Sequence, residues 1–180
     1  YQTVAIPKDG LYRFEIGGGR GGKCSNRGTT IMYGASATGD FYLTKDQRIT
    51  IVVGVGGGDY SSPHGNEAGG GGATWVKDET NNTLLMAAGG AGGAAGNTWG
   101  TSCTRDTNIG RGQSSQGVQS FTCAYTVSAP STGDGGNANG NYHGGAGGGY
   151  NGDGQNGGTH CGNAKGGQGF NNGLQGGTGN

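Results

Sequence analysis

Two glycine runs enclose a polar turn and two apolar segments in the stretch GGGGATWVKDETNNTLLMAAGGAG, residues 69–92. Residues 73–76 (ATWV) and 84–88 (LLMAA) are short, apolar and free of proline, which is typical of strands. The polar residues 77–83 between them predict a turn, so the stretch is expected to form a β-hairpin. The rest of the chain divides in the same way, into a few strand-like segments and a large amount of glycine.

Glycine contributes 48 of the 180 residues, far above the usual share of about 7%. Collagen is excluded, because it needs glycine at every third position and much proline, whereas this chain has 3 prolines and glycine in all three phases. Disorder is the alternative, since such chains often bury too little apolar surface to offset their ordering entropy. The charged fraction is only 12%, however, so glycine-rich segments repel one another little and can order through backbone hydrogen bonds.

The charge balance limits the kinds of partner. Lys+Arg and Asp+Glu each number 11, so the chain carries no basic footprint for nucleic acid or for an anionic membrane surface. No apolar run approaches the roughly 20 residues of a membrane span, and no membrane insertion is expected. No signal peptide is present, so Tyr1 is expected to begin a mature or trimmed chain.

The cysteines indicate an oxidising compartment. They are Cys24, Cys103, Cys123 and Cys161, and their long spacings contain no Cys-x-x-Cys motif, so no metal site is expected. An even number of cysteines in a chain with so small a core predicts two disulfide bonds and an extracellular location. Three pairings remain open, and four free thiols are the alternative.

One sequon for N-glycosylation occurs in the predicted hairpin turn. Asn81-Asn82-Thr83 fits the acceptor pattern, which makes Asn81 a candidate for glycosylation in a secreted protein. Such triplets also occur often by chance.

Further strands are predicted where apolar and β-branched residues alternate with polar ones. These strands are residues 3–6, 11–16, 40–44 and 48–53, with 31–34 and 120–127 as additional candidates. The Asp-Gly turn at residues 8–10 is expected to join the first two strands as a hairpin, and 45–47 form another turn. No stretch has helical periodicity, so the fold class is mostly β with almost no α-helix.

The order of three segments resembles a known family. The segments IPKDGLYRFEIGGGRGGK, GDFYLTKDQRITIVVG and GGGGATWVKDETNNTLLMAAGGAGGAAG are similar to the glycine-rich domain in the ectodomains of the anaplastic lymphoma kinase and leukocyte tyrosine kinase receptors. The resemblance covers residues 4–96, and GGGGATWV followed by LLMAAGGAG is its most specific part. It implies an antiparallel β-sandwich like that of tumour necrosis factor, with inserted bundles of polyglycine II helices, and an extracellular, non-enzymatic role.

Polyglycine II is physically reasonable for this chain. It has three residues per turn and no internal hydrogen bonds, so its N–H and C=O groups point outward to neighbouring helices. Residues 1–128 are expected to form the sandwich with its glycine-rich insertions, and residues 129–180 to pack on it as a polyglycine II or irregular glycine-rich segment, within one compact unit. The chain ends in GLQGGTGN, without the strand that closes the sandwich in the family. Either residues 120–127 take that place, or the sandwich is open, or the chain is incomplete.

No catalytic residue, cofactor or metal is predicted. Residues 17–23 (GGGRGGK) follow a strand and nearly match a phosphate-binding loop, but the helix that such a loop needs does not follow. His160 lies next to Cys161, although sequence neighbours rarely have the geometry of a nucleophile and its base. The other isolated candidates are His64 and His143, the acidic residues Asp59, Asp134 and Asp153, which lack calcium-loop spacing, and the aromatic residues Trp99, Tyr142, Tyr150 and Phe170, which either form a binding set or cap the glycine-rich bundle.

These features favour an extracellular structural protein. An open sandwich would expose a strand edge to another chain, so a self-associating subunit of a fibre, appendage or matrix is the first hypothesis. The second is a binding module of a receptor ectodomain or adhesin tip that recognises a protein or a glycan.

Overall fold

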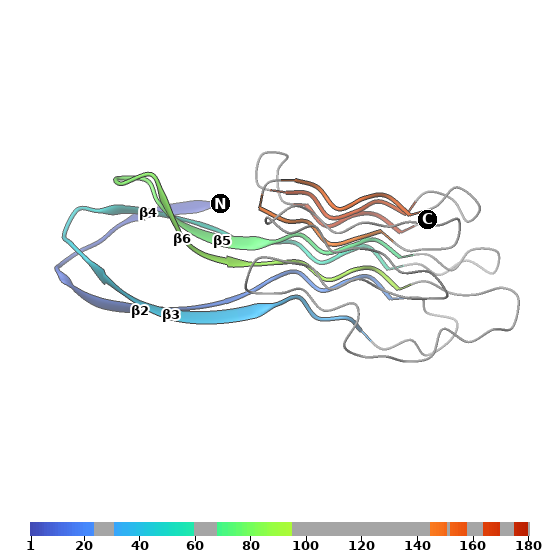
Figure 1. The fold of residues 1–180 in the computed structure, drawn as a ribbon, viewed down its shortest axis with the longest axis horizontal. Helices are drawn as coiled ribbons and strands as arrows, with labels where there is room; N and C mark the ends of the chain where they lie inside the picture. The colour runs from blue at the N-terminus through green and yellow to red at the C-terminus, as the bar shows by residue number, and fades with distance from the viewer. Residues whose placement is uncertain are drawn as a thin grey trace, which may run out of the picture.

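The described residues form six strands in two sheets, which lie at one end of the structure (Figure 1). A computed structural model describes residues 1–23, 31–59, 68–94, 145–150, 152–157, 164–169 and 175–179, and this part is mostly β and contains no helix, as expected. The strands are β1 (Gln2–Ala5), β2 (Gly10–Gly17), β3 (Ser36–Leu43), β4 (Arg48–Val52), β5 (Thr74–Asp78) and β6 (Thr83–Ala88). They make two antiparallel sheets, one in the order β1-β4-β5-β6 and one of β2 and β3 (Figure 1).

The hairpin expected at the centre of the chain is confirmed. β5 and β6 pair antiparallel, with Asp78 opposite Thr83. β5 is longer than predicted, because Lys77 and Asp78 join the ladder and leave a shorter turn. In that turn Asn82 has φ 51°, a left-handed conformation that asparagine tolerates better than most residues.

The hairpin predicted from residues 3–6 and 11–16 is wrong, because the two strands belong to different sheets. β1 pairs with β4, whereas β2 pairs with β3 along its whole length. Ile6 still donates its N–H to Gln47 O at 2.9 Å, but Pro7 has no N–H with which to continue a ladder, and the chain crosses to the other sheet. The turn at residues 45–47 crosses back beside it, and Lys45 N–H donates to the Asp9 carboxylate at 2.6 Å. The local turn signals therefore located both turns correctly, but they did not show which strands pair with each other.

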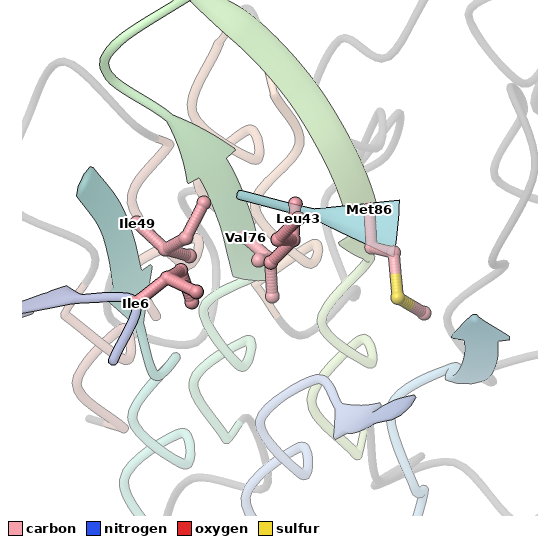
Figure 2. Close-up of a cluster of buried hydrophobic side chains, with 5 residues drawn as sticks. All are labelled: Ile6, Leu43, Ile49, Val76 and Met86. Carbon is pink, nitrogen blue, oxygen red and sulfur yellow. The ribbon is translucent and has the colours of Figure 1, made fainter. Parts of the chain in front are cut away.

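Apolar side chains from both sheets meet in one cluster. Figure 2 shows its buried members, Ile6, Leu43, Ile49, Val76 and Met86. Alternate residues of β2 add to it, since Tyr12, Phe14 and Ile16 lie on its inner face, and the Phe14 ring is 6.1 Å from that of Phe41. The two sheets come closest where β3 lies beside β6. At the same side Ala35, just before β3, donates its N–H to Gly89 O, just after β6, at 2.9 Å.

Glycine-rich segments continue the strands away from the sheets (Figure 1). Nine described segments run side by side and are here called the glycine bundle: residues 18–23, 31–35, 53–59, 68–73, 89–94, 145–150, 152–157, 164–169 and 175–179. The candidate strand at residues 31–34 is wrong, because this segment belongs to the bundle: Gly21 N–H donates to Met32 O at 2.9 Å. The candidate strand at residues 120–127 lies outside the described residues.

Candidate functional site

One segment lies at the centre of the glycine bundle. Along residues 68–73, N–H groups three residues apart donate to the same neighbouring segment. The donor and acceptor pairs are Ala68 with Ala94, Gly71 with Ala91, Gly69 with Gly58, Gly72 with Val55, and Gly70 with Lys165, at N···O distances of 2.7–3.1 Å. The backbone of the central segment thus directs donors in three directions with a period of three residues.

The carbonyl groups of the central segment follow the same period toward three other segments. The donor N–H and acceptor C=O pairs are Gly145 with Ala68, Gly148 with Gly71, Gly22 with Gly69, Gly19 with Gly72, and Gly177 with Gly70. The central segment therefore has six neighbours, three that accept its hydrogen bonds and three that donate to it. The N–H and C=O groups of residues 68–72 are each satisfied by backbone rather than by side chains or a strand ladder.

The six neighbours also bond to one another and close a ring. The bonds around the ring are Gly57 to Arg20, Gly58 to Gly177, Lys165 to Thr178, Gly167 to Ala146, Gly93 to Gly145 and Ala91 to Gly19. Two further segments, 31–35 and 152–157, lie outside the ring against pairs of its members. The described residues 145–179 thus share one hydrogen-bond network with residues 18–94.

Glycine is needed in the bundle for close approach. A Cβ built on Gly70 would lie 1.9 Å from Ala146 O, and one on Gly69 would lie 1.9 Å from Gly177 O. Both distances are impossible for real atoms, so any side chain there would push the segments apart. Gly92 differs, because its Cβ would meet nothing closer than Gly145 O at 3.9 Å. Positive φ is not the reason for the glycines, since the glycines with described surroundings have no such φ between +20° and +160°.

Arg20 links two ring segments at the surface of the bundle. Its guanidinium contacts the Asp59 carboxylate at 2.7 and 3.3 Å and also donates to Gly21 O at 2.9 Å. Its aliphatic stem lies over Gly56, where a Cβ would be 3.2 Å from Arg20 Cγ. The hydrogen bond from Arg20, with a second from Lys23 N–H, holds the pKa of Asp59 below its usual value.

The backbone hydrogen bonds of residues 18–23 exclude a phosphate site at the loop pattern in residues 17–23. The N–H groups of Gly18, Gly19, Gly21 and Gly22 all donate to backbone carbonyls of the bundle, at 2.8–2.9 Å. Lys23 N–H donates to Asp59, so a carboxylate already lies where a phosphate would have to bind. The N–H groups that make such a loop an anion site are therefore occupied.

A buried polar network holds the tip of the β5–β6 hairpin. The Asp78 carboxylate is 2% exposed and accepts from the Gln47 amide, from Asn81 Nδ2 at 2.7 Å and from the N–H groups of Thr80 and Asn81. Burial raises the pKa of this carboxyl. The hydrogen bonds from Asn81, Gln47 and Thr80 together lower the pKa by more than burial raises it, so it lies below its ordinary value. Gln47 in turn accepts from Thr44 N–H at 2.9 Å.

An aromatic pair joins the bundle to the sheet. Tyr150, at the end of segment 145–150, packs edge-on against Trp75 of β5 with 4.7 Å between ring centroids. Val52, Ala73, Leu84 and Ala87 complete this second apolar cluster, on the opposite face of β5 from Val76. Of the predicted aromatic set, Tyr150 is half-buried and caps the sheet, and the other three residues lie outside the described part.

The structure separates the other predicted site residues. Asn81 is exposed at the hairpin tip, as the sequon requires, and its Nδ2 already donates to Asp78. Asp59 and Asp153 lie in different bundle segments, and the described residues contain no group of three or more His, Cys, Asp and Glu suited to a metal. The four cysteines Cys24, Cys103, Cys123 and Cys161, the three histidines and Asp134 lie outside the described residues.

The Arg20–Asp59 pair and the network around Asp78 were missed from the sequence. A single arginine inside the run GGGRGGK was a usable signal, because a long side chain within a glycine bundle must lie on its surface. Gln47 and Asp78 carried no such signal, since their contact depends on the pairing of β4 with β5.

Comparison with known proteins adds no family assignment. The chain matches no protein-family model and has no significant match among curated proteins. In the part that the structure describes, no helix is long and apolar enough to cross a membrane.

Proposed function

We propose that the glycine bundle consists of polyglycine II helices and that the two sheets form a sandwich like that of tumour necrosis factor. The period of three in the hydrogen bonds of residues 68–73 supports the first point, because a polyglycine II helix has three residues per turn and bonds only to its neighbours. The shared cluster around Ile49 and Val76 supports the second.

The function that this arrangement supports best is structural: a non-enzymatic, extracellular subunit that associates with itself in a fibre, appendage or matrix. One observation carries it, the six-neighbour bundle, in which a segment is held on all sides by backbone hydrogen bonds. Each such bond contributes about 1 kcal/mol net, so the bundle gains stiffness from many small terms rather than from a large apolar core. A rigid rod attached to a small sandwich is suited to bearing load or to spacing.

The four cysteines fit this role as two disulfide bonds, because an extracellular protein folds in an oxidising compartment. We further propose a glycan on Asn81, whose Nδ2 would keep one N–H for Asp78.

A second candidate function is recognition of a protein or glycan, as in a receptor ectodomain or adhesin tip. It is favoured by the rigid bundle itself, because binding proteins often carry their recognition residues on loops that a rigid scaffold positions. The two functions differ in their dependence on concentration.

Negative-stain electron microscopy of the native, non-reduced protein tests the proposal, together with mass spectrometry of the same sample. Regular filaments or ordered assemblies would support the structural subunit, and two disulfides would lower the mass by about four hydrogens. Discrete particles at every concentration would contradict self-association and favour the recognition module.

A further inference from the structure

We propose that the free edge of β1 is the surface through which two copies of this chain associate. This inference rests on the proposed self-associating function and assigns it a site. Among the strands that the structure describes, β1 is at the edge of the larger sheet and pairs only with β4. Gln2, Thr3 and Ala5 are exposed, and no described residue pairs with the outer side of this edge.

The hydrogen-bond pattern shows which groups of β1 are available. Ile6 N–H donates to Gln47 O, and bonded positions alternate along an antiparallel pair, so Val4 and Gln2 also bond to β4. Thr3 and Ala5 therefore direct their N–H and C=O groups away from the sheet. The close contact of Thr3 Oγ1 with Thr50 Oγ1, at 2.9 Å, fits a non-bonded pair, in which facing side chains are nearer.

The other edges are protected in ways that β1 is not. β2 carries Arg13 and Glu15, and β3 carries Asp40, which are charges of the kind that discourage edge pairing. β6 lies beside β3 and follows a bulge in its pairing with β5. The sequence of β1, QTVA, has no charge, no proline and no bulge in its pairing with β4.

A second copy of β1 is the occupant that the chemistry favours. Antiparallel pairing about a two-fold axis at Val4 would place Thr3 of one copy opposite Ala5 of the other, so that the outward groups of both are satisfied. The edge is uncharged and the chain has zero net charge, so two copies meet without like-charge repulsion. Pro7, without an N–H, would end the new ladder on each side. The two larger sheets would then continue into one another.

The test compares the full-length wild type with two variants at one exposed position. Ala5→Pro removes the outward N–H but leaves the bonds to β4, whereas Ala5→Ser keeps that N–H. Analytical ultracentrifugation over a concentration series should show a dimer for the wild type and for Ala5→Ser. Ala5→Pro should raise the dissociation constant at least about tenfold, because the dimer loses a bond at each of two symmetric places.

Hydrogen exchange on the wild type gives an independent readout that does not depend on how the variant folds. The amides of Thr3 and Ala5 should become protected as concentration rises, while those of β2 stay unchanged. If the wild type associates but these amides exchange freely and Ala5→Pro associates equally well, the β1 assignment is wrong and the self-associating function stands. If the wild type is monomeric throughout, with Thr3 and Ala5 unprotected, both proposals fail and the edge belongs to another partner or to none.

Discussion

Trp75 and Tyr150 meet edge to face with their ring centroids 4.7 Å apart, at an interplanar angle of 63°. Trp75 belongs to the central hairpin and is 2% exposed, whereas Tyr150 ends a glycine-rich segment far along the chain. Among the described residues of the C-terminal part, Tyr150 is the large side chain that enters an apolar cluster of the sheet. It therefore couples two kinds of structure, one held by side-chain burial and the other by backbone hydrogen bonds.

Replacing Tyr150 should loosen this coupling. Tyr150→Ala removes an aromatic contact and uncovers Trp75, so we expect the free energy of unfolding to fall by about 2–3 kcal/mol, less than for a fully buried aromatic residue. Urea denaturation followed by tryptophan fluorescence measures the loss. Tyr33→Ala is the matched control, because Tyr33 is 61% exposed and should cost no more than about 0.5 kcal/mol. Equal effects of the two variants would show that the Trp75 contact contributes nothing specific.

Glycine substitutions should divide sharply by position in the bundle. Gly70→Ala places a Cβ 1.9 Å from Ala146 O, so the segments must separate and several backbone bonds must break. We expect a loss of more than about 3 kcal/mol, at the severe end for single substitutions. Gly92→Ala meets only ordinary contact, and should be neutral or stabilising by up to about 1 kcal/mol through the unfolded chain.

Chemical denaturation of both glycine variants gives the comparison, with far-UV circular dichroism to check folding. A Gly70→Ala protein as stable as Gly92→Ala would mean that the bundle is not packed backbone to backbone at its centre.

The fold was predictable to the extent that it depends on local pattern. Alternating residues located β2, and the apolar run after the glycines located β5. The pairing of the strands was not predictable, because the chain crosses from one sheet to the other after Pro7 and again at the turn at 45–47. A turn has the same sequence signal whether or not the two strands that it joins pair with each other.

The glycine bundle was predictable in kind but not in arrangement. The glycine content indicates that backbone groups must bond to one another. Glycine-rich segments are alike, however, so the sequence does not show which of them lie side by side or that residues 68–73 lie at the centre. The polar contacts behave similarly. Asp78 looks like a turn residue until the pairing of β4 with β5 brings Gln47 to it.

Stability should depend on pH through Asp78. Its folded-state pKa lies below the ordinary value, so its contribution is complete above the pKa of the unfolded chain and is lost as pH falls through the folded pKa. All its partners are donors, so Asp78→Asn turns an amide toward them and should cost about 2 kcal/mol near pH 7.

Urea denaturation between pH 7 and pH 3 tests this prediction. The wild type should lose more stability on acidification than Asp78→Asn, and the difference isolates Asp78 from the other paired carboxylates. Parallel pH curves for the two proteins would mean that the carboxylate charge is not what holds the hairpin tip.

Two arginine–aspartate pairs of similar geometry should differ in how much they contribute to the free energy of unfolding. Arg13 and Asp40 face each other on neighbouring strands and are exposed, whereas Arg20 also covers Gly56 with its stem and joins two bundle segments through Asp59. Arg20→Ala should therefore destabilise the protein by about 1 kcal/mol, a modest figure because the pair is partly exposed to solvent, and by more than Arg13→Ala. Arg20→Met keeps the stem and loses the charge, so it should recover part of the loss. Repeating the denaturation in high salt should weaken the wild type more than Arg20→Met, which keeps the other surface ion pairs but lacks this one. Identical losses for Arg20→Ala and Arg13→Ala would show that the link to Asp59 does not help to hold the bundle together.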